Sequence, residues 1–200
     1  MESKRASIIV LSGGASSRFG SDKSKALIGA QSLIQRILTS IPAEFEVIIV
    51  GPEPGIETGG YFCLQEKPLG GGPVAGFKAG LAACTSEIVG LIATDMPFAI
   101  TGVINLLNSM TPHDDAVIYV DAEGFKQPLA AVYRVAAVEK ALVEIGDANG
   151  QSMRNLVSHL QVREIEMDSQ VAQTLIDIDT QADLKRAIAF SQSLADNSEL

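Results

Sequence analysis

Residues 6–14, Ala6-Ser7-Ile8-Ile9-Val10-Leu11-Ser12-Gly13-Gly14, decide the fold class of this chain. The first six form a short, continuous apolar run that is rich in β-branched side chains and is stopped by the glycines. Such a run predicts a strand that is buried on both faces, as in a parallel sheet covered by helices. The small residues that follow allow backbone N–H groups to approach an anion closely.

Short apolar runs alternate with helical patterns along the rest of the chain. We expect further strands at residues 46–50, 61–64, 87–93, 115–120, 129–133 and 161–167, and helices at 32–40, 74–84, 101–110, 135–145, 152–160 and 180–190. This alternation favours an α/β fold, a three-layer Rossmann-like sandwich around a mostly parallel sheet. We expect one domain over residues 1–190 and a flexible tail over residues 191–200.

Composition restricts the function classes. The apolar share of 46% and the charged share of 20% are those of an ordinary globular protein. We expect neither a membrane span, which needs about 18 apolar residues, nor a secretory signal. The two cysteines have no metal-binding spacing, so a reducing cytoplasm is the expected location. The net charge of −9 argues against a general nucleic-acid binder.

Basic residues gather in and just after the glycine-rich loop. Residues 13–36 hold one acidic side chain, Asp22, and four basic ones, which are Arg18, Lys23, Lys25 and Arg36. A local excess of positive charge in an acidic protein indicates a small anionic ligand at one place. A solvated, charged surface loop is the alternative that charge alone leaves open.

The loop fits neither common phosphate-binding template. A dinucleotide fingerprint needs a glycine where the chain has Ala15, and a P-loop needs one where it has Phe19. Arg18 and Lys23 nevertheless lie where they could neutralise a triphosphate and the pyrophosphate that leaves it. We therefore assign both to catalysis of phosphoryl-group chemistry.

Asp95 follows the strand expected at 87–93 and precedes Met96 and Pro97. Ligands of parallel sheets bind beyond the carboxyl ends of the strands, which places Asp95 at the same edge as the glycine-rich loop. A carboxylate there suits Mg²⁺, which prefers hard oxygen donors. The alternative, a cap for the helix near Thr101, is disfavoured because Asp95 lies six residues too early.

A second glycine-rich stretch, Gly70-Gly71-Gly72-Pro73, precedes the helix expected at 74–84. A helix N-terminus without bulky side chains can approach a base or ribose with its free N–H groups. An ordinary entry from a loop into a helix explains the stretch equally well.

Four motifs, in the same order along the chain, resemble those of the molybdenum cofactor guanylyltransferases. Residues 11–23 resemble L-x-G-G-x-S-x-R-M-G-x-D-K, Gly72-Pro73-Val74-Ala75-Gly76 resembles G-P-L-A-G, Thr94-Asp95-Met96-Pro97-Phe98 resembles C-D-M-P-F, and residues 127–133 resemble Q-P-L-x-A-x-Y. Asp177-Ile178-Asp179-Thr180 occupies the place of N-x-N-T. The similarity spans residues 6–190 and implies the fold of the nucleotide-diphospho-sugar transferases.

The resemblance implies transfer of GMP from GTP to the phosphate of molybdopterin, with Mg²⁺ as cofactor and pyrophosphate as the second product. It implies molybdenum-insertion proteins or apo-molybdoenzymes as partners. It assigns catalysis to Arg18, Lys23 and Asp95; GTP binding to Leu11, Gly13, Gly14, Lys23, Glu66 and Asp95; the metal to Asp95; and the pterin side to Gln127, Asp177 and Asp179.

The sequence departs from the family pattern at two places. Phe19 replaces a methionine, and Asp177 and Asp179 replace paired asparagines. Two carboxylates would repel a phosphorylated pterin unless they are protonated or bridged by a cation. Asp-Ile-Asp-Thr and Gly146-Asp147 resemble the related cytidylyltransferases, so a molybdopterin cytidylyltransferase or a sugar-phosphate nucleotidyltransferase is the alternative enzyme. A nucleotide-binding module without catalysis is the alternative of another class.

Overall fold

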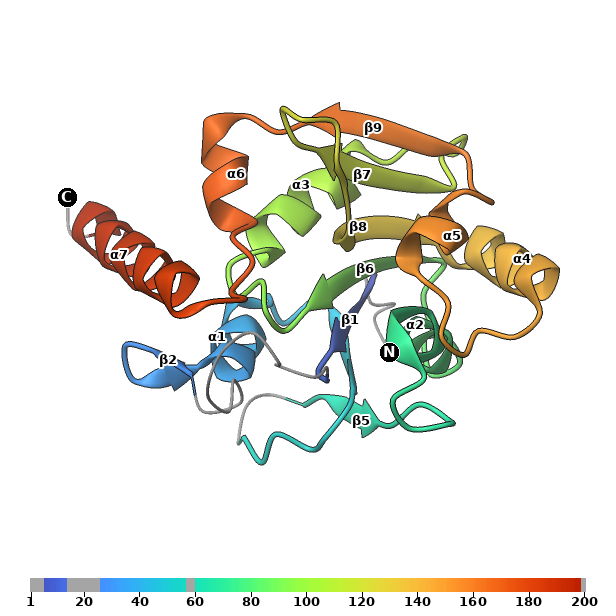
Figure 1. The fold of residues 1–200 in the computed structure, drawn as a ribbon, viewed down its shortest axis with the longest axis horizontal. Helices are drawn as coiled ribbons and strands as arrows, with labels where there is room; N and C mark the ends of the chain where they lie inside the picture. Colours follow the sequence, from blue (N-terminus) through green and yellow to red (C-terminus); the bar gives the residue numbers. More distant parts are fainter. Residues whose placement is uncertain (1–5, 14–25, 57–59, 199–200) are drawn as a thin grey trace.

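The central sheet has seven strands in the order β5-β4-β1-β6-β8-β7-β9 (Figure 1). The computed structural model describes residues 6–13, 26–56 and 60–198. The strands of this sheet are β1 (Ser7–Leu11), β4 (Glu46–Val50), β5 (Phe62–Leu64), β6 (Ile88–Ala93), β7 (Ala116–Val120), β8 (Lys126–Arg134) and β9 (Val162–Glu166). A separate hairpin is formed by β2 (Leu27–Ile28) and β3 (Gln31–Ser32).

The direction of the strands brings the ends of β1, β4 and β6 together. Within the seven-stranded sheet, β8 is antiparallel to β6 and β7, and the other pairs are parallel. Leu11, the last residue of β1, is in register with Val50 of β4 and with Ala93 of β6. The expected mostly parallel sheet is therefore confirmed, and its carboxyl edge is where we look for a site.

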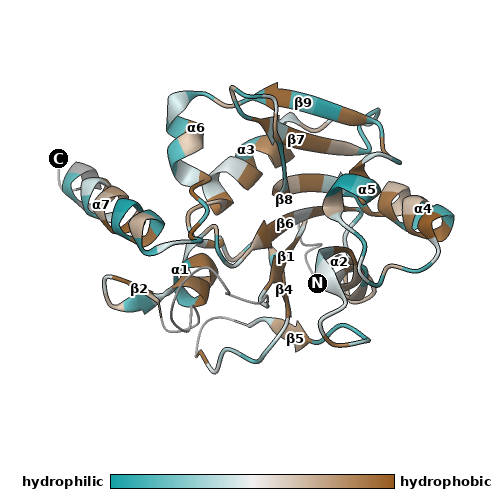
Figure 2. Ribbon diagram, viewed as in Figure 1, coloured by the Kyte–Doolittle hydropathy of each residue, from teal (hydrophilic) through white to brown (hydrophobic). Residues whose placement is uncertain are grey.

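Helices cover both faces of the sheet, as Figures 1 and 2 show. They are α1 (Leu33–Ser40), α2 (Gly72–Leu81), α3 (Ile100–Ser109), α4 (Val135–Ile145), α5 (Met153–Val157), α6 (Ser169–Thr174) and α7 (Gln181–Ser198). One face packs against α2, α4 and α5, and the other against α1, α3 and α6. The three-layer arrangement is the one that the alternating pattern predicted.

Strand β1 shows why the sheet is buried on both faces. Every one of its residues is buried. Ile9 belongs to the cluster that contains Phe77 of α2, whereas Ile8 belongs to the cluster that contains Val103 of α3. Because successive side chains of a strand point to opposite faces, a continuous apolar run is what such a strand requires.

Four elements, α7, β2, β3 and α6, differ from the sequence-based expectation. The C-terminal helix continues through Ser198, where we expected a tail from residue 191. Residues 191–198 contain neither glycine nor proline, so no residue there stops a helix. The β2–β3 hairpin and helix α6 were not expected, because elements of two to six residues are too short to show periodicity.

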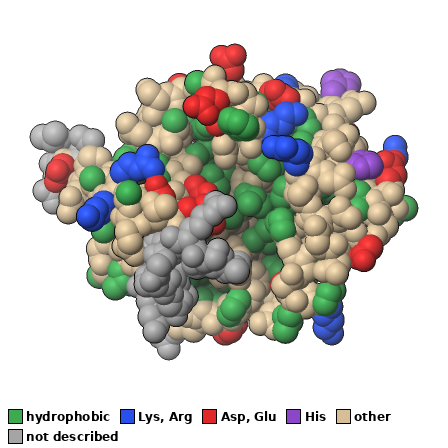
Figure 3. Space-filling model, in the orientation of Figure 1, with side chains coloured by type: hydrophobic (Ala, Val, Ile, Leu, Met, Phe, Trp, Pro, Cys, Tyr) green, Lys and Arg blue, Asp and Glu red, His purple; other side chains and the backbone are tan. Residues whose placement is uncertain are grey.

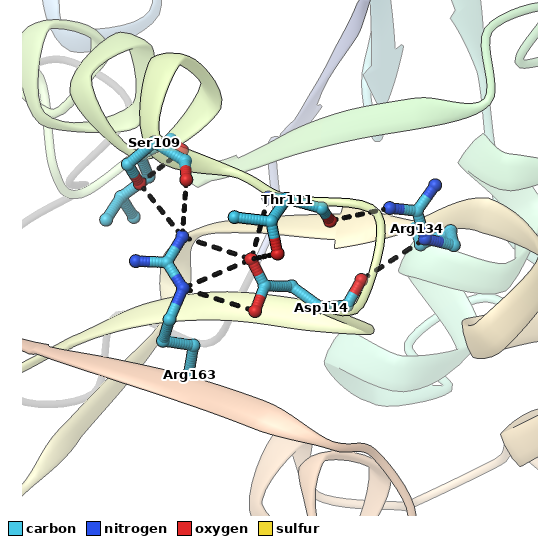
Figure 4. A network of polar contacts seen from close by, with 6 residues as sticks. Ser109, Thr111, Asp114, Arg134 and Arg163 are labelled. Atoms are coloured by element: carbon cyan, nitrogen blue, oxygen red, sulfur yellow. Dashed lines mark hydrogen bonds and ion pairs between the residues drawn. The ribbon is translucent and has the colours of Figure 1, made fainter.

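A polar network fastens the β9 side of the sheet (Figure 4). Asp114 is 8% exposed, and both of its carboxylate oxygens accept hydrogen bonds of 3.1 Å from Nε of Arg163 on β9. Arg163 also donates through Nη2 to the carbonyl oxygen of Ser109, 2.6 Å away. The hydrogen bond from Arg163, helped by those from Thr111, lowers the pKa of Asp114 to about 2. The network therefore joins α3, β7 and β9 through an ionised carboxylate.

None of the helices in the described part of the chain has both the length and the apolar character that a membrane crossing requires.

Candidate active site

The loops after β1, β4 and β6 are held against one another at the carboxyl edge. The backbone N–H of Ser12 donates to the carbonyl oxygen of Val50, 2.7 Å away. Thr94 donates to the carbonyl oxygen of Leu11 through its backbone N–H at 3.0 Å and its Oγ1 at 2.6 Å. These bonds fix the start of the glycine-rich loop and the residue before Asp95 to the same strand end.

Gly51 permits this close approach. Its φ is +142°, and a Cβ built on it would lie 1.6 Å from the carbonyl oxygen of Ser12. No side chain fits at that distance, so only glycine allows the loop after β4 to cross behind Ser12. In the loop after β1, Gly13 follows Ser12 and has open space where a Cβ would stand.

Asp95 lies beside two carboxylates from the other end of the chain. One oxygen each of Asp95, Asp177 and Asp179 can be chosen so that all three lie within 4.8 Å of one another. The backbone N–H of Ile178 donates to the carbonyl oxygen of Asp95 at 3.0 Å, which fastens the two segments together. Three carboxylates at this separation repel one another, and a divalent cation among them removes that repulsion. We name these residues the three-carboxylate group; its hard oxygen donors fit Mg²⁺.

The sequence assigned these carboxylates to different roles. It placed Asp95 on the metal and Asp177 and Asp179 on the pterin side, whereas the structure brings all three together. The motif comparison already pointed to a cation near Asp177 and Asp179. Carboxylates in the place of paired asparagines are tolerated beside a phosphate only when they are protonated or bridged by a cation. What the sequence lacked was any measure of the distance between residue 95 and residues 177–179.

Helix α7 holds the chain next to Asp179. Oδ2 of Asp183 accepts hydrogen bonds from the backbone N–H of Asp179 at 3.2 Å and of Thr180 at 2.7 Å. The N–H of Asp183 in turn donates to Oγ1 of Thr180 at 3.2 Å. This reciprocal cap makes Thr180 the N-cap of the helix. The hydroxyl of Thr180, and then Arg186, lower the pKa of Asp183 to about 2.

The second glycine-rich stretch leads into α2 at the same edge. Glu66, the expected guanine contact, accepts through Oε1 a hydrogen bond of 2.8 Å from the backbone N–H of Gly70. The other carboxylate oxygen of Glu66, Oε2, takes no part in this hydrogen bond. A Cβ on Gly76 of α2 would lie 3.3 Å from Cδ2 of Leu11, so the helix packs directly against the end of β1. Leu11 itself is buried, and its role toward GTP stays a prediction.

Gln127 lies near the start of β8 and is half-buried. Lys126 pairs with Val120, the last residue of β7. Because β8 is antiparallel to β7, its start lies at the carboxyl edge of the sheet. The role of Gln127 toward the pterin stays a prediction. Gly14, Arg18 and Lys23 lie outside the described residues, and their roles stay predictions.

Arg36, counted above with the basic residues of the loop, packs within the protein. Its Cζ lies 5.3 Å from the ring centroid of Phe98, and its Nη2 donates to the carbonyl oxygen of Ile28 at 3.3 Å. Burial lowers its pKa. The cation therefore contributes to packing between α1, β2 and the segment after Asp95.

Figure 3 shows hydrophobic side chains lining a hollow at the centre of one face, with acidic and basic side chains near its border. This combination suits a ligand that has an apolar ring and charged groups.

Comparison with known proteins decides the family. The family model described as the MobA-like NTP transferase domain matches residues 8–164. The chain belongs to this family. It is accordingly a nucleotidyltransferase, and the expected fold and family are confirmed.

Relatives of the MobA-like family match over nearly the whole chain. A probable molybdenum cofactor guanylyltransferase of Bacillus licheniformis is 30% identical over 193 residues, which are 91% of this chain and 96% of the relative. A protein of the same description from Pelotomaculum thermopropionicum is 29% identical over 197 residues, 92% of this chain and 93% of the relative.

Solved structures share the fold at lower identity. Molybdopterin-guanine dinucleotide biosynthesis protein A from Archaeoglobus fulgidus has a TM-score of 0.69 at 20% identity, over 94% of this chain and 99% of that one. The 2-C-methyl-D-erythritol 4-phosphate cytidylyltransferase from Thermus thermophilus has a TM-score of 0.64 at 18% identity, over 94% and 98%. At these identities the likeness concerns the fold, which carries more than one nucleotidyl transfer.

Proposed function

We propose that this MobA-like nucleotidyltransferase transfers GMP from GTP to the phosphate of molybdopterin and releases pyrophosphate. The observation that carries the chemistry is the three-carboxylate group, whose oxygens lie within 4.8 Å of one another at the end of β6. The choice of GTP and molybdopterin is supported by the order of the four motifs and by the description of the relatives as guanylyltransferases.

Asp95, Asp177 and Asp179 are the proposed ligands of one Mg²⁺. When bound, the ion neutralises charge on the triphosphate and on the pyrophosphate that leaves. The carboxylates supply the hard oxygens that this ion prefers. Their grouping also gives Asp177 and Asp179 a place on the acceptor side, because a cation among them removes their repulsion of a phosphorylated pterin.

The reaction needs no nucleophilic side chain. An oxygen of the acceptor phosphate forms a bond to the α-phosphorus of GTP, and the bond from that phosphorus to the β-phosphate oxygen breaks. Because the acceptor is already an anion, the protein contributes alignment and charge neutralisation. We assign neutralisation of the phosphates to Arg18 and Lys23.

Binding of the two substrates is assigned along the carboxyl edge. Leu11, Gly13 and Gly14 would contact the nucleoside through their backbone, and Glu66 would contact guanine through the oxygen that Gly70 does not engage. Gln127, at the start of β8, would lie on the pterin side.

A related cytidylyltransferase is the second candidate, favoured by the carboxylates at positions 177 and 179. Nucleotide preference separates the two. The purified chain is incubated with Mg²⁺, molybdopterin and each of the nucleoside triphosphates in turn, and pyrophosphate is followed. Release with GTP supports the proposal, whereas release with CTP and none with GTP would contradict it. Binding of GTP without turnover on any acceptor would favour a nucleotide-binding module.

A further inference from the structure

A third hydrophobic cluster lies outside the central sheet and includes Ile178, which stands between two members of the three-carboxylate group. Its fully or nearly buried members are Ala26, Ile28, Leu33, Phe98, Ile178 and Ala187, and Leu184, Ile188 and Phe190 of α7 pack against them. None of these described residues belongs to the seven-stranded sheet. The two larger clusters hold the sheet and its covering helices. The third cluster therefore stabilises something other than the sheet itself.

Two members of this cluster are chain neighbours of the proposed metal ligands. Ile178 is 0% exposed and stands between Asp177 and Asp179, so its side chain enters the cluster while the carboxylates beside it meet Asp95. Phe98 is three residues after Asp95 and is also buried. The cluster thus anchors both of the segments that supply the carboxylates.

Helix α7 closes the cluster from outside. The ring of Phe190 meets the ring of Phe98 edge to face, with centroids 5.0 Å apart and planes at 86°. This is a favoured geometry for an aromatic pair. Arg36 of α1 packs on the same Phe98 ring, 5.3 Å from its centroid. Phe98 is therefore contacted by α1, near the N-terminus, and by α7, near the C-terminus.

The start of α7 fixes the remaining end of the segment. Oδ2 of Asp183 accepts a hydrogen bond from the backbone N–H of Asp179. The carbonyl oxygen of Asp95 accepts one from the backbone N–H of Ile178. The segment 177–179 is thus fastened by one backbone bond at each of two successive residues and by the burial of Ile178. Its geometry depends on where α7 lies.

We infer that α7 is a positioning element that sets the cation affinity of the three-carboxylate group, acting through the contact of Phe190 with Phe98 and through the burial of Ile178. The inference rests on the proposed function, which places a cation among these carboxylates. Loss of the Phe190 ring loosens Phe98 and lets Asp95 move relative to residues 177–179. Removal of a group that orients metal ligands lowers affinity about tenfold or more.

The test measures Mn²⁺, which takes oxygen ligands as Mg²⁺ does, on the full chain without nucleotide. Free Mn²⁺ is titrated by electron paramagnetic resonance in wild type, Phe190→Ala and Phe190→Leu. The Mn²⁺ binding that is lost in Asp95→Asn is the part that belongs to the three-carboxylate group. Leu194→Ala is the matched control, because Leu194 lies one helical turn further along α7 and is 47% exposed.

We expect Phe190→Ala to raise the dissociation constant of Mn²⁺ about tenfold, Phe190→Leu to restore most of the affinity, and Leu194→Ala to leave it unchanged. Thermal unfolding followed by circular dichroism shows whether the variants keep the sheet. In the transfer assay, Phe190→Ala should need more Mg²⁺ for half-maximal pyrophosphate release and regain wild-type kcat at saturating Mg²⁺, which a merely unfolded variant would not do.

Two results would overturn the inference, and they differ from each other. Folded Phe190→Ala with wild-type Mn²⁺ affinity overturns the role of α7 and leaves the metal site standing. If Asp95→Asn binds Mn²⁺ as well as the wild-type chain does, or if the wild-type chain binds none, the proposed metal site is overturned. The inference about α7 then falls with it.

Discussion

The backbone N–H of Ile178 donates a 3.0 Å hydrogen bond to the carbonyl oxygen of Asp95, and this contact joins the end of β6 to the segment before α7. Asp95 follows a central strand, whereas Ile178 lies 83 residues further along the chain. The bond places the carboxylates of Asp177 and Asp179 beside that of Asp95. The proposed metal site is therefore assembled from two segments that only the complete fold brings together.

Asp95→Asn should bind GTP and make no detectable dinucleotide. The amide keeps the size of the side chain and loses the charge that holds a cation, so pyrophosphate release should fall by about a hundredfold or more. Glu139→Gln on α4, an exposed residue, is the control and should keep full activity. Activity of Asp95→Asn within a few fold of wild type would remove Asp95 from the mechanism.

Asp177→Asn combined with Asp179→Asn restores the asparagines of the family pattern. Two anionic oxygens become neutral ones, so the group should hold a divalent cation less tightly. We expect the half-saturating Mg²⁺ concentration for pyrophosphate release to rise about tenfold. If that concentration stays at the wild-type value, these two carboxylates do not contribute to the metal site.

Much of the candidate site could be predicted from sequence, and the part that could not depends on contacts between residues far apart in the chain. The apolar runs of β1 and β4 predict buried strands, and the position of Asp95 after β6 places it at the carboxyl edge. The meeting of Asp95 with residues 177–179 depends on the burial of Ile178 under α7, a long-range packing contact that local periodicity does not contain. The continuation of α7 to Ser198 also escaped prediction, because its polar residues carry no strong apolar stripe.

Gly51→Ala should damage both stability and nucleotide binding. Its Cβ would stand 1.6 Å from the carbonyl oxygen of Ser12, so the start of the glycine-rich loop must shift. We expect a loss of about 3 kcal/mol in the free energy of unfolding, measured by urea titration, together with weaker GTP binding. Gly55→Ala is the matched control: Gly55 also has positive φ but has open space, so it should cost only about 1 kcal/mol. Equal losses in the two variants would show that the contact with Ser12 is unimportant.

The stabilisation that ionised Asp114 gives to the folded chain should be lost in acid. The pKa of Asp114 is lowered from 3.8 to about 2 in the folded protein, so the folded state favours the ionised carboxylate. The stabilisation is fully present above about pH 4 and is lost as the pH falls to about 2. Removal of the charge by Asp114→Asn should cost about 1–3 kcal/mol at neutral pH, since Arg163 loses its partner.

The check is urea unfolding of wild type and Asp114→Asn across this pH range. The difference between their free energies of unfolding should shrink as the pH falls. A difference that stays constant with pH would mean that the ionisation of Asp114 does not contribute.

The identity of the transferred nucleotide tests the central proposal most directly. Wild-type chain is given Mg²⁺, molybdopterin and an equimolar mixture of GTP and CTP, and the dinucleotide product is identified by mass spectrometry. We predict the guanine dinucleotide of molybdopterin, formed together with pyrophosphate and absent with Asp95→Asn. Formation of the cytosine dinucleotide instead, or of neither product while GTP is bound, would contradict the assignment.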